Sequence, residues 1–300
     1  MQLELLPKPR EGHFEVILGA YQSIKILNLI RFKHAAFYLR IVTSMKIGCT
    51  SFSFEHLFKR QEMNLKQFVG ICKKLNVEGV EFWGEHFPTL DNGYIMELRE
   101  ESSDLEVVAI AVENLNFTSL SVAEREADVK QVKSWIDIAI KLGADLVRIV
   151  PGNLKALNAD PARTYPLVKE ALRDCLGYAR TRDVPLAIEN CPRDTDPWII
   201  LKLIEEIGTD HLGTCPDFGN FPAEIRYRGL RQFAPYAMHV HAKAYEFGQN
   251  GEETSIDYSK AIQILKDAKY NRYLSAEYEG TGNELEEIKK TVALIKRNLR

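Results

Sequence analysis

The chain has 300 residues, of which 45% are hydrophobic and 27% are charged, and its formal net charge is −3. This balance is typical of a soluble globular protein, and the lack of excess positive charge disfavours nucleic acid as a partner. No segment has the roughly 18 consecutive apolar residues that a membrane-spanning helix requires, so we predict no membrane interaction.

The five cysteines are widely spaced and include no CxxC pair. An odd number of cysteines without such pairs argues against a disulfide framework and against a thiolate zinc site. We therefore predict a reducing, cytoplasmic location.

Residues 1–44 differ in composition from the rest of the chain. They are basic, with Glu4, Glu11 and Glu15 as their only acids. An organellar targeting peptide is also basic and poor in acids, but this segment lacks the serine content typical of such peptides. Because MKIGCTSFSF, from Met45 onward, reads as a natural first strand, we interpret residues 1–44 as an N-terminal extension, non-native or disordered. Residues 45–300 are predicted to form a single folded domain.

From Met45 onward, short segments rich in β-branched residues alternate with longer segments whose apolar residues recur every three or four positions. The predicted strands are 46–52, 77–83, 106–112, 145–150, 185–190, 212–218, 237–243 and 273–279. The clearest predicted helices are 65–75, 124–144 and 161–182, and Gly143 is expected to cap the second of them.

This alternation predicts a parallel sheet in an α/β protein. Eight strand–helix units in about 255 residues match the (β/α)8 TIM barrel in number and size. A doubly wound open sheet is the alternative, but the first strand–helix turn lacks the GxGxxG phosphate loop of that fold.

Polar side chains collect at the predicted C-terminal ends of the last four strands, where TIM barrels hold their active sites. Side chains alternate along a strand, so His239, His241 and Lys243 of YAMHVHAKAYEF point the same way. The acidic and histidine residues at these four strand ends are Glu189, Asp217, His239, His241, Glu277 and Glu279.

Two carboxylates from opposite ends of this row, with an aspartate and an imidazole between them, can surround one divalent cation. Such ligands suit Mn²⁺, Mg²⁺, Co²⁺ or a permissive zinc site. A single acidic residue at a strand end is usually a solvated cap or half of an ion pair. Four metal-competent residues in register on consecutive strands instead favour a metal site. His239 lies deeper and is expected to be a hydrogen-bonded interior histidine, whereas Glu279 is expected at the rim.

The segments GVEFW, LVRIVPGN, LAIENCP, TCPDFGNF, HVHAKAY and LSAEYEG follow one another in this order. Over residues 45–300 this series resembles the strand ends of the xylose isomerase-like TIM barrel superfamily, the sugar phosphate isomerase/epimerase group. The resemblance implies a metal ion held by Glu189, Asp217, His241 and Glu277. It also implies that Glu189 and Glu277 form the catalytic acid/base pair and that Lys243 faces the substrate.

Further polar and aromatic groups at strand ends are predicted to contact the substrate. Arg148, Asn190 and Asn220 suit sugar hydroxyls or a carboxylate. Glu81, Trp83 and His86 are expected to form the opposite wall of the site, with Trp83 stacked on a sugar face. Ion pairing and packing are the alternative roles of these groups. The predicted substrate-binding residues are Glu81, Trp83, His86, Arg148, Asn190, Asn220, Lys243 and Glu279.

A cation that polarises a carbonyl group makes the neighbouring C–H proton removable by a carboxylate. We therefore predict a divalent-metal-dependent sugar isomerase or epimerase that acts on a keto-sugar or related polyol through a metal-stabilised enediolate. The acids in EGTGNELEE would repel a phosphate group, so we expect an unphosphorylated small molecule as substrate. The sequence leaves homo-oligomer formation open.

Three alternative functions remain. A metal-dependent dehydratase of the cyclitol or dehydroshikimate type would use the same metal site. An abasic-site endonuclease needs a histidine-rich cluster of metals, but the chain has only seven histidines, two of them in residues 1–44. A non-catalytic sugar-binding protein would have no obvious use for the four metal-competent residues.

Overall fold

The structure, a computed structural model, describes residues 44–152, 154–191 and 197–300. The chain divides into two units, Met1–Ser44 and Met45–Arg300. The predicted extension lies outside the described residues, apart from Ser44. The account below therefore concerns the second unit.

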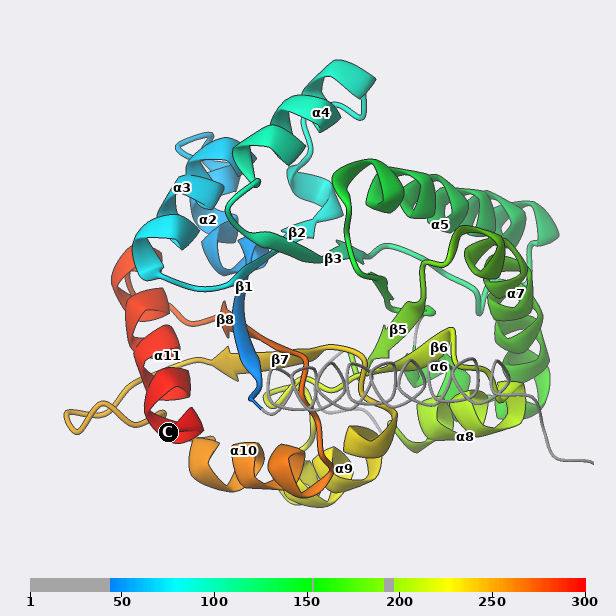
Figure 1. Ribbon diagram of the computed structural model, residues 1–300. Helices are drawn as coiled ribbons and strands as arrows, with labels where there is room; N and C mark the ends of the chain where they lie inside the picture. The colour runs from blue at the N-terminus through cyan, green and yellow to red at the C-terminus, as the bar shows by residue number, and fades with distance from the viewer. Residues whose placement is uncertain (1–43, 153, 192–196) are drawn as a thin grey trace, which may run out of the picture. The chain divides into compact units, whose positions relative to one another are not determined.

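Eight parallel strands form the centre of this unit (Figure 1). They are β1 (Lys46–Thr50), β2 (Gly79–Trp83), β3 (Glu106–Val112), β4 (Val147–Ile149), β5 (Leu186–Glu189), β6 (Leu212–Cys215), β7 (Val240–Ala244) and β8 (Tyr273–Tyr278). The order in the sheet is β6-β5-β4-β3-β2-β1-β8-β7. Single parallel bridges from Thr214 to Ala237 and from Asp217 to His241 join the two ends of this order. The predicted α/β TIM barrel is confirmed.

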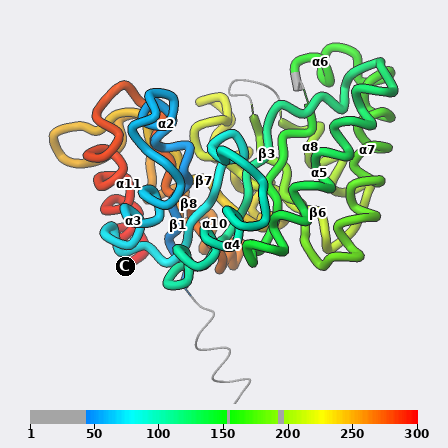
Figure 2. The backbone as a smooth tube through the Cα atoms, turned by 90° about the horizontal axis from the view of Figure 1, so that it is seen from above, coloured from blue at the N-terminus to red at the C-terminus, as the bar shows by residue number. Residues whose placement is uncertain are grey.

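Helices surround the strands (Figure 1). In the turned view of Figure 2, α2, α3 and α11 lie on one side of the barrel, and α5, α7 and α8 lie on the other. The α-helices are α2 (Glu55–Lys59), α3 (Leu65–Leu75), α4 (Asn92–Glu101), α5 (Val122–Leu142), α6 (Leu154–Ala159), α7 (Pro161–Arg182), α8 (Trp198–Ile207), α9 (Arg226–Phe233), α10 (Tyr258–Asp267) and α11 (Glu284–Leu299). None of the helices in the described part of the chain is both long and apolar enough to cross a membrane.

Local signals in the sequence set the ends of these helices. Helix α3 begins at a capping box in which Asn64 and Gln67 satisfy each other's backbone N–H groups. Helix α7 begins after Asp160, whose side chain accepts the N–H of Arg163. Helix α5 ends at Gly143, which has a φ of 75° and is the predicted glycine cap.

The two faces of the sheet are packed differently. The outer face and the helices share the large hydrophobic core. A separate small cluster consists of Ala109, Leu146, Ala187 and Cys215. Ala109 is the register partner of Glu81, and Cys215 is the register partner of Glu189, so this cluster shares the barrel interior with buried carboxylates. Small side chains inside the barrel therefore leave room for the polar groups of the site.

Candidate metal and acid–base site

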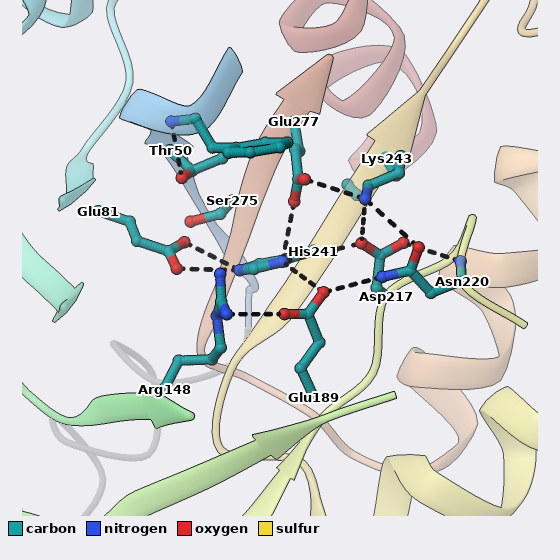
Figure 3. Close-up of polar contacts among 12 residues, drawn as sticks. Thr50, Glu81, Arg148, Glu189, Asp217, Asn220, His241, Lys243, Ser275 and Glu277 are labelled. Atoms are coloured by element: carbon teal, nitrogen blue, oxygen red, sulfur yellow. Dashed lines mark hydrogen bonds and ion pairs between the residues drawn. The ribbon is translucent and has the colours of Figure 1, made fainter. Parts of the chain in front are cut away.

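The three predicted carboxylate ligands converge on the imidazole ring of His241, the fourth predicted ligand (Figure 3). Its Nδ1 atom lies 2.8 Å from Oε2 of Glu277, 3.4 Å from Oε1 of Glu189 and 3.8 Å from Oδ2 of Asp217. None of the four residues is more than 3% exposed. Figure 3 shows Glu189 and Glu277 approaching the ring from opposite sides. The structure thus brings together the ligand set that the resemblance implies.

Asp217 is held in place by the turn that follows β6. Asn190 exchanges two hydrogen bonds with the Asp217 backbone: Nδ2 donates to the carbonyl at 3.2 Å, and Oδ1 accepts the N–H at 2.7 Å. Oδ1 of Asp217 accepts the N–H groups of Gly219 and Asn220. A Cβ atom on Gly219 would lie 2.9 Å from Cδ of Lys243, so the turn needs glycine there. The second carboxylate oxygen, Oδ2, is thereby directed toward His241.

The donor atoms of these residues fit a divalent cation. One buried atom of each predicted ligand makes ion-pair contacts but no hydrogen bond within the described residues: Oε2 of Glu189, Oδ2 of Asp217, Nδ1 of His241 and Oε2 of Glu277. Glu189, Asp217 and His241 also offer ligand atoms that all lie within 4.8 Å of one another. Three carboxylate oxygens and one imidazole nitrogen are ligand types that divalent cations accept, so this set of atoms is a chemically suitable metal site.

Two buried cations flank the cluster. Nζ of Lys243 lies 3.0 Å from both Oδ2 of Asp217 and Oε1 of Glu277, and 2.7 Å from Oε2 of Glu279 at the rim. Nη1 of Arg148 lies 3.1 Å from Oε2 of Glu189. These ion pairs offset part of the repulsion among the buried carboxylates.

The same charges set the protonation of the carboxylates. Burial acts to raise the pKa of Glu189, but Arg148 and His241 outweigh it and hold that pKa well below its usual range. Burial likewise opposes ionisation of Glu277, and Lys243 and His241 lower its pKa. For Asp217, burial outweighs the attraction of Lys243 and raises the pKa to about 7. The two predicted acid/base carboxylates are therefore ionised at neutral pH.

We expected Glu81 in the wall of the substrate site, but in the structure its carboxylate lies beside Nε2 of His241. Its carboxylate is fully buried and lies 3.0 Å from Nε2 of His241 and 3.0 Å from Nε2 of His239. Nε2 of His239 also lies 3.0 Å from Oγ of Ser275. Burial opposes the charge on Glu81, but His241 and His239 lower its pKa well below the usual range. Glu81 is therefore a buried partner of both histidines.

A cavity of about 990 Å³ opens beside the carboxylates. Its walls include six of the residues predicted for the site, Arg148, Glu189, Asn220, Lys243, Glu277 and Glu279, and also Cys191. Asn220 donates from Nδ2 to Oε1 of Glu189 at 3.0 Å. Asn190 is not among the lining residues, because its side chain is used to hold Asp217.

Trp83 and His86 also lie outside the walls of this cavity. Both line a separate hollow between β2 and the α2–α3 region. His86 stacks on Phe58 with 3.6 Å between ring centroids, and its Nδ1 lies 3.0 Å from Oγ of Ser51. Trp83 packs edge to face on Phe52, which does line the cavity. The structure thus places both side chains against neighbouring rings and in this separate hollow, and not in the cavity wall where we expected them.

Two features of the cavity were missed from the sequence. Glu113 lines it and lies 3.1 Å from Nη1 of Arg148. It directly follows β3, so the rule that located the other strand-end residues also applies to it. The aromatic residues Tyr245 and Phe247 line the same cavity from the segment after β7, where no strand periodicity marks them, and Phe52 lines it from a short 3-10 helix (Ser51–Phe54) after β1.

Comparisons with known proteins agree with this fold. One relative is an uncharacterized protein of Methanocaldococcus jannaschii. It is 24% identical to this chain over 259 residues, and the alignment covers 79% of this chain and 84% of the relative. The structure of a D-tagatose 3-epimerase-like protein is similar, with a TM-score of 0.66, 18% identity, and coverage of 85% of this chain and 100% of that one. The probable 3-DHS dehydratase AsbF from Bacillus anthracis has a TM-score of 0.63, 17% identity, and coverage of 84% and 99%.

These structural similarities, at low sequence identity, show a shared fold. The family is shown by a match that covers most of the sequence. The family model described as "Xylose isomerase-like TIM barrel" matches residues 69–298. The chain therefore belongs to the xylose isomerase-like TIM barrel family.

Proposed function

We propose that this protein is a divalent-metal-dependent sugar isomerase or epimerase that moves a proton on the carbon next to a carbonyl group. The observation that carries the proposal is the convergence of four buried side chains that can bind a metal, two of them carboxylates on opposite sides of His241 (Figure 3). The similarity to a D-tagatose 3-epimerase-like protein supports an isomerase of a keto-sugar.

Glu189, Asp217, His241 and Glu277 would hold the cation. When bound, a divalent cation supplies polarisation of the substrate carbonyl and stabilises the enediolate. The donor set suits manganese, magnesium or cobalt, with zinc as a further candidate.

The residues of the chain account for the proton transfer itself. Glu189 and Glu277 are both ionised and both line the cavity, so each can accept a proton from a sugar carbon. A carboxylate on each face of the sugar allows removal from one side and return on the other, which inverts the carbon. Lys243 and Asn220 line the same wall and can donate hydrogen bonds to sugar oxygens.

Solvent deuterium exchange tests this proposal. In D2O with added Mn²⁺, the protein should incorporate deuterium into a keto-sugar, and Glu189→Gln or Glu277→Gln should slow incorporation by about 10²–10⁴-fold. Glu62→Gln, which removes a surface carboxylate paired with Arg60, is the matched control. Metal content measured on the same samples separates loss of the proton-transfer group from loss of the cation. Full exchange in both site variants would refute the acid/base pair.

A dehydratase is the second candidate, because the probable 3-DHS dehydratase AsbF is nearly as similar in structure as the epimerase-like protein. Removal of the same C–H proton followed by loss of a neighbouring hydroxyl would give an unsaturated product. Ultraviolet absorbance of that product distinguishes the two reactions. Nucleic acid fits the cavity poorly, since Glu246, Glu279 and Glu287 line it and would repel a phosphate backbone.

A further inference from the structure

Glu113 is a carboxylate of the cavity wall that the proposed reaction does not use. It directly follows β3, and Arg148 of β4 and Glu189 of β5 line the same cavity. Oε1 of Glu113 accepts hydrogen bonds from both terminal nitrogens of Arg148, at 3.1 Å from Nη1 and at 3.2 Å from Nη2. Nη1 of Arg148 also lies 3.1 Å from Oε2 of Glu189 (Figure 3). Arg148 therefore links the carboxylates that belong to the two strands beside its own.

Glu113 is the contact that fixes the guanidinium plane of Arg148. The Nε atom of Arg148 is buried and has no hydrogen-bond partner within the described residues. In the same part of the chain, the ion pairs of this guanidinium group join it to Glu113 and Glu189 and to no other residue. The arginine fork is planar and rigid, so hydrogen bonds from both terminal nitrogens to one oxygen fix its plane. The single contact with Glu189 would leave that plane free to turn, so Glu113 sets the direction from which Nη1 approaches Glu189.

The ion pair with Arg148 is one of two contacts on opposite oxygens of the Glu189 carboxylate. The other oxygen, Oε1, accepts Nδ2 of Asn220 at 3.0 Å. The last torsion angle of a glutamate is soft, so contacts at both oxygens hold the carboxylate plane in one orientation. Proton transfer depends on such placement, since a displacement of about 1 Å can lower a reaction rate by about 100-fold. Loss of Glu113 would loosen one of these two contacts.

We propose that Glu113 is a positioning residue that holds Arg148, so that Arg148 and Asn220 together orient the carboxylate of Glu189. This inference rests on the proposed function and extends the site to β3. Glu113 itself gives or takes no proton. The simpler alternative is that Glu113 acts by its charge alone, which would attract any cation bound nearby. The two accounts differ in whether the effect of Glu113 depends on its reach and on Arg148.

Three variants of Glu113 separate its reach from its charge, and calorimetric titration of the metal-free protein with Mn²⁺ gives the affinity of each. Glu113→Met removes both the acceptor and the charge, and Glu113→Asp keeps the charge but is one methylene shorter. Glu113→Gln keeps an acceptor oxygen at full length without the charge. We expect Glu113→Met and Glu113→Asp to weaken Mn²⁺ binding by about 10-fold, and Glu113→Gln to weaken it less. Binding by Glu113→Asp that equals the wild type, or that exceeds Glu113→Gln, overturns the proposal.

A double-mutant cycle shows whether Glu113 acts through Arg148. In the Arg148→Met background, Glu113→Met should change the Mn²⁺ affinity by less than about twofold, because the residue that transmits its effect is missing. An equal loss in both backgrounds means that Glu113 acts on the cation directly, and it contradicts the proposal. Glu106→Met is the matched control, because Glu106 begins β3 at the opposite end of the strand and pairs with Lys46 at the surface. The single Glu113 variants decide the question if the double variant does not fold.

Solvent deuterium exchange separates this inference from the proposed function. At saturating Mn²⁺ and with D-fructose as the probe, Glu113→Met should lower kcat and leave KM nearly unchanged, because Glu113 orients Glu189 and does not bind the sugar. A raised KM with unchanged kcat makes Glu113 a sugar-binding residue and overturns the inference. Unchanged exchange and Mn²⁺ affinity in Glu113→Met leave the proposed reaction intact and overturn the positioning role. Mn²⁺ affinity that depends on Glu113 through Arg148, without exchange into any keto-sugar by the wild type, leaves the positioning role intact and overturns the reaction.

Discussion

Nε2 of His241 lies 3.0 Å from Oε1 of Glu81 at the base of the site. A ring N–H that points at Glu81 leaves Nδ1 as the ring atom that faces Glu189, Asp217 and Glu277. Carboxylates that accept the second N–H of a metal-binding histidine fix its tautomer and orientation. Glu81 is therefore assigned a positioning role.

Replacing Glu81 tests this role. Glu81→Gln should weaken Mn²⁺ binding by about 10–100-fold, because an amide holds the His241 tautomer less firmly. Calorimetric titration of the metal-free protein with Mn²⁺ measures the change. Glu78→Gln is the matched control, since Glu78 is exposed and accepts the N–H of Ile47 away from the site. Unchanged affinity in Glu81→Gln would exclude the positioning role.

The ion pair between Arg148 and Glu189 should matter for stability. Both side chains are 3% exposed, so Arg148→Met leaves a buried carboxylate without its cation. Breaking a buried pair in this way costs about 3–5 kcal/mol of unfolding free energy. Urea denaturation at neutral pH without metal gives the value.

The control for Arg148→Met is Lys46→Met. Lys46 and Glu106 form an ion pair whose side chains are 43% and 54% exposed. Exposed pairs contribute about 0–1 kcal/mol, so this variant should unfold nearly as the wild type does. A similar loss in both variants would mean that burial of the Arg148 pair has no special effect.

His86 should make the protein less stable in acid. Burial lowers the pKa of His86 from 6.5 to about 3, with a smaller contribution from Lys59. Between these two values the unfolded chain binds a proton that the folded chain does not, so stability falls as pH decreases from 6.5 toward 3. His86→Gln should therefore lose less stability than the wild type between pH 7 and pH 5.

Thermal unfolding of the metal-free protein at several pH values provides the measurement for His86. Above pH 7 neither state binds the proton, so the difference between wild type and His86→Gln should be constant there. A difference that stays constant down to pH 4 would contradict the low pKa.

Periodic parts of the fold were predictable from the sequence. The segments 65–75 and 161–182 are helices with those bounds, because their caps lie next to their apolar patterns. The predicted fourth strand, 145–150, is shorter in the structure, where β4 is Val147–Ile149. Strand ends depend on hydrogen bonds to distant neighbours, which local patterns do not specify.

The same distinction applies to the site. Strand-end position brought Glu189 and Glu277 together correctly, because parallel strands end at one rim. It failed for Trp83 and His86, whose orientation depends on contacts with Phe52 and Phe58. Strand position also does not reveal the place of Glu81. Its carboxylate contacts His241 of β7 and His239, the residue before β7, and contacts between distant strands of this kind leave no local pattern.

The central claim is that Glu189, Asp217, His241 and Glu277 form one metal site. The most direct test is metal content by mass spectrometry after incubation with excess Mn²⁺ and desalting, comparing wild type with Asp217→Asn. Asparagine can still accept the N–H groups of Gly219 and Asn220 but loses the charge of Oδ2. The account predicts close to one Mn²⁺ per wild-type chain and little in the variant. A wild type without bound metal, or a variant that keeps it in full, would contradict the account.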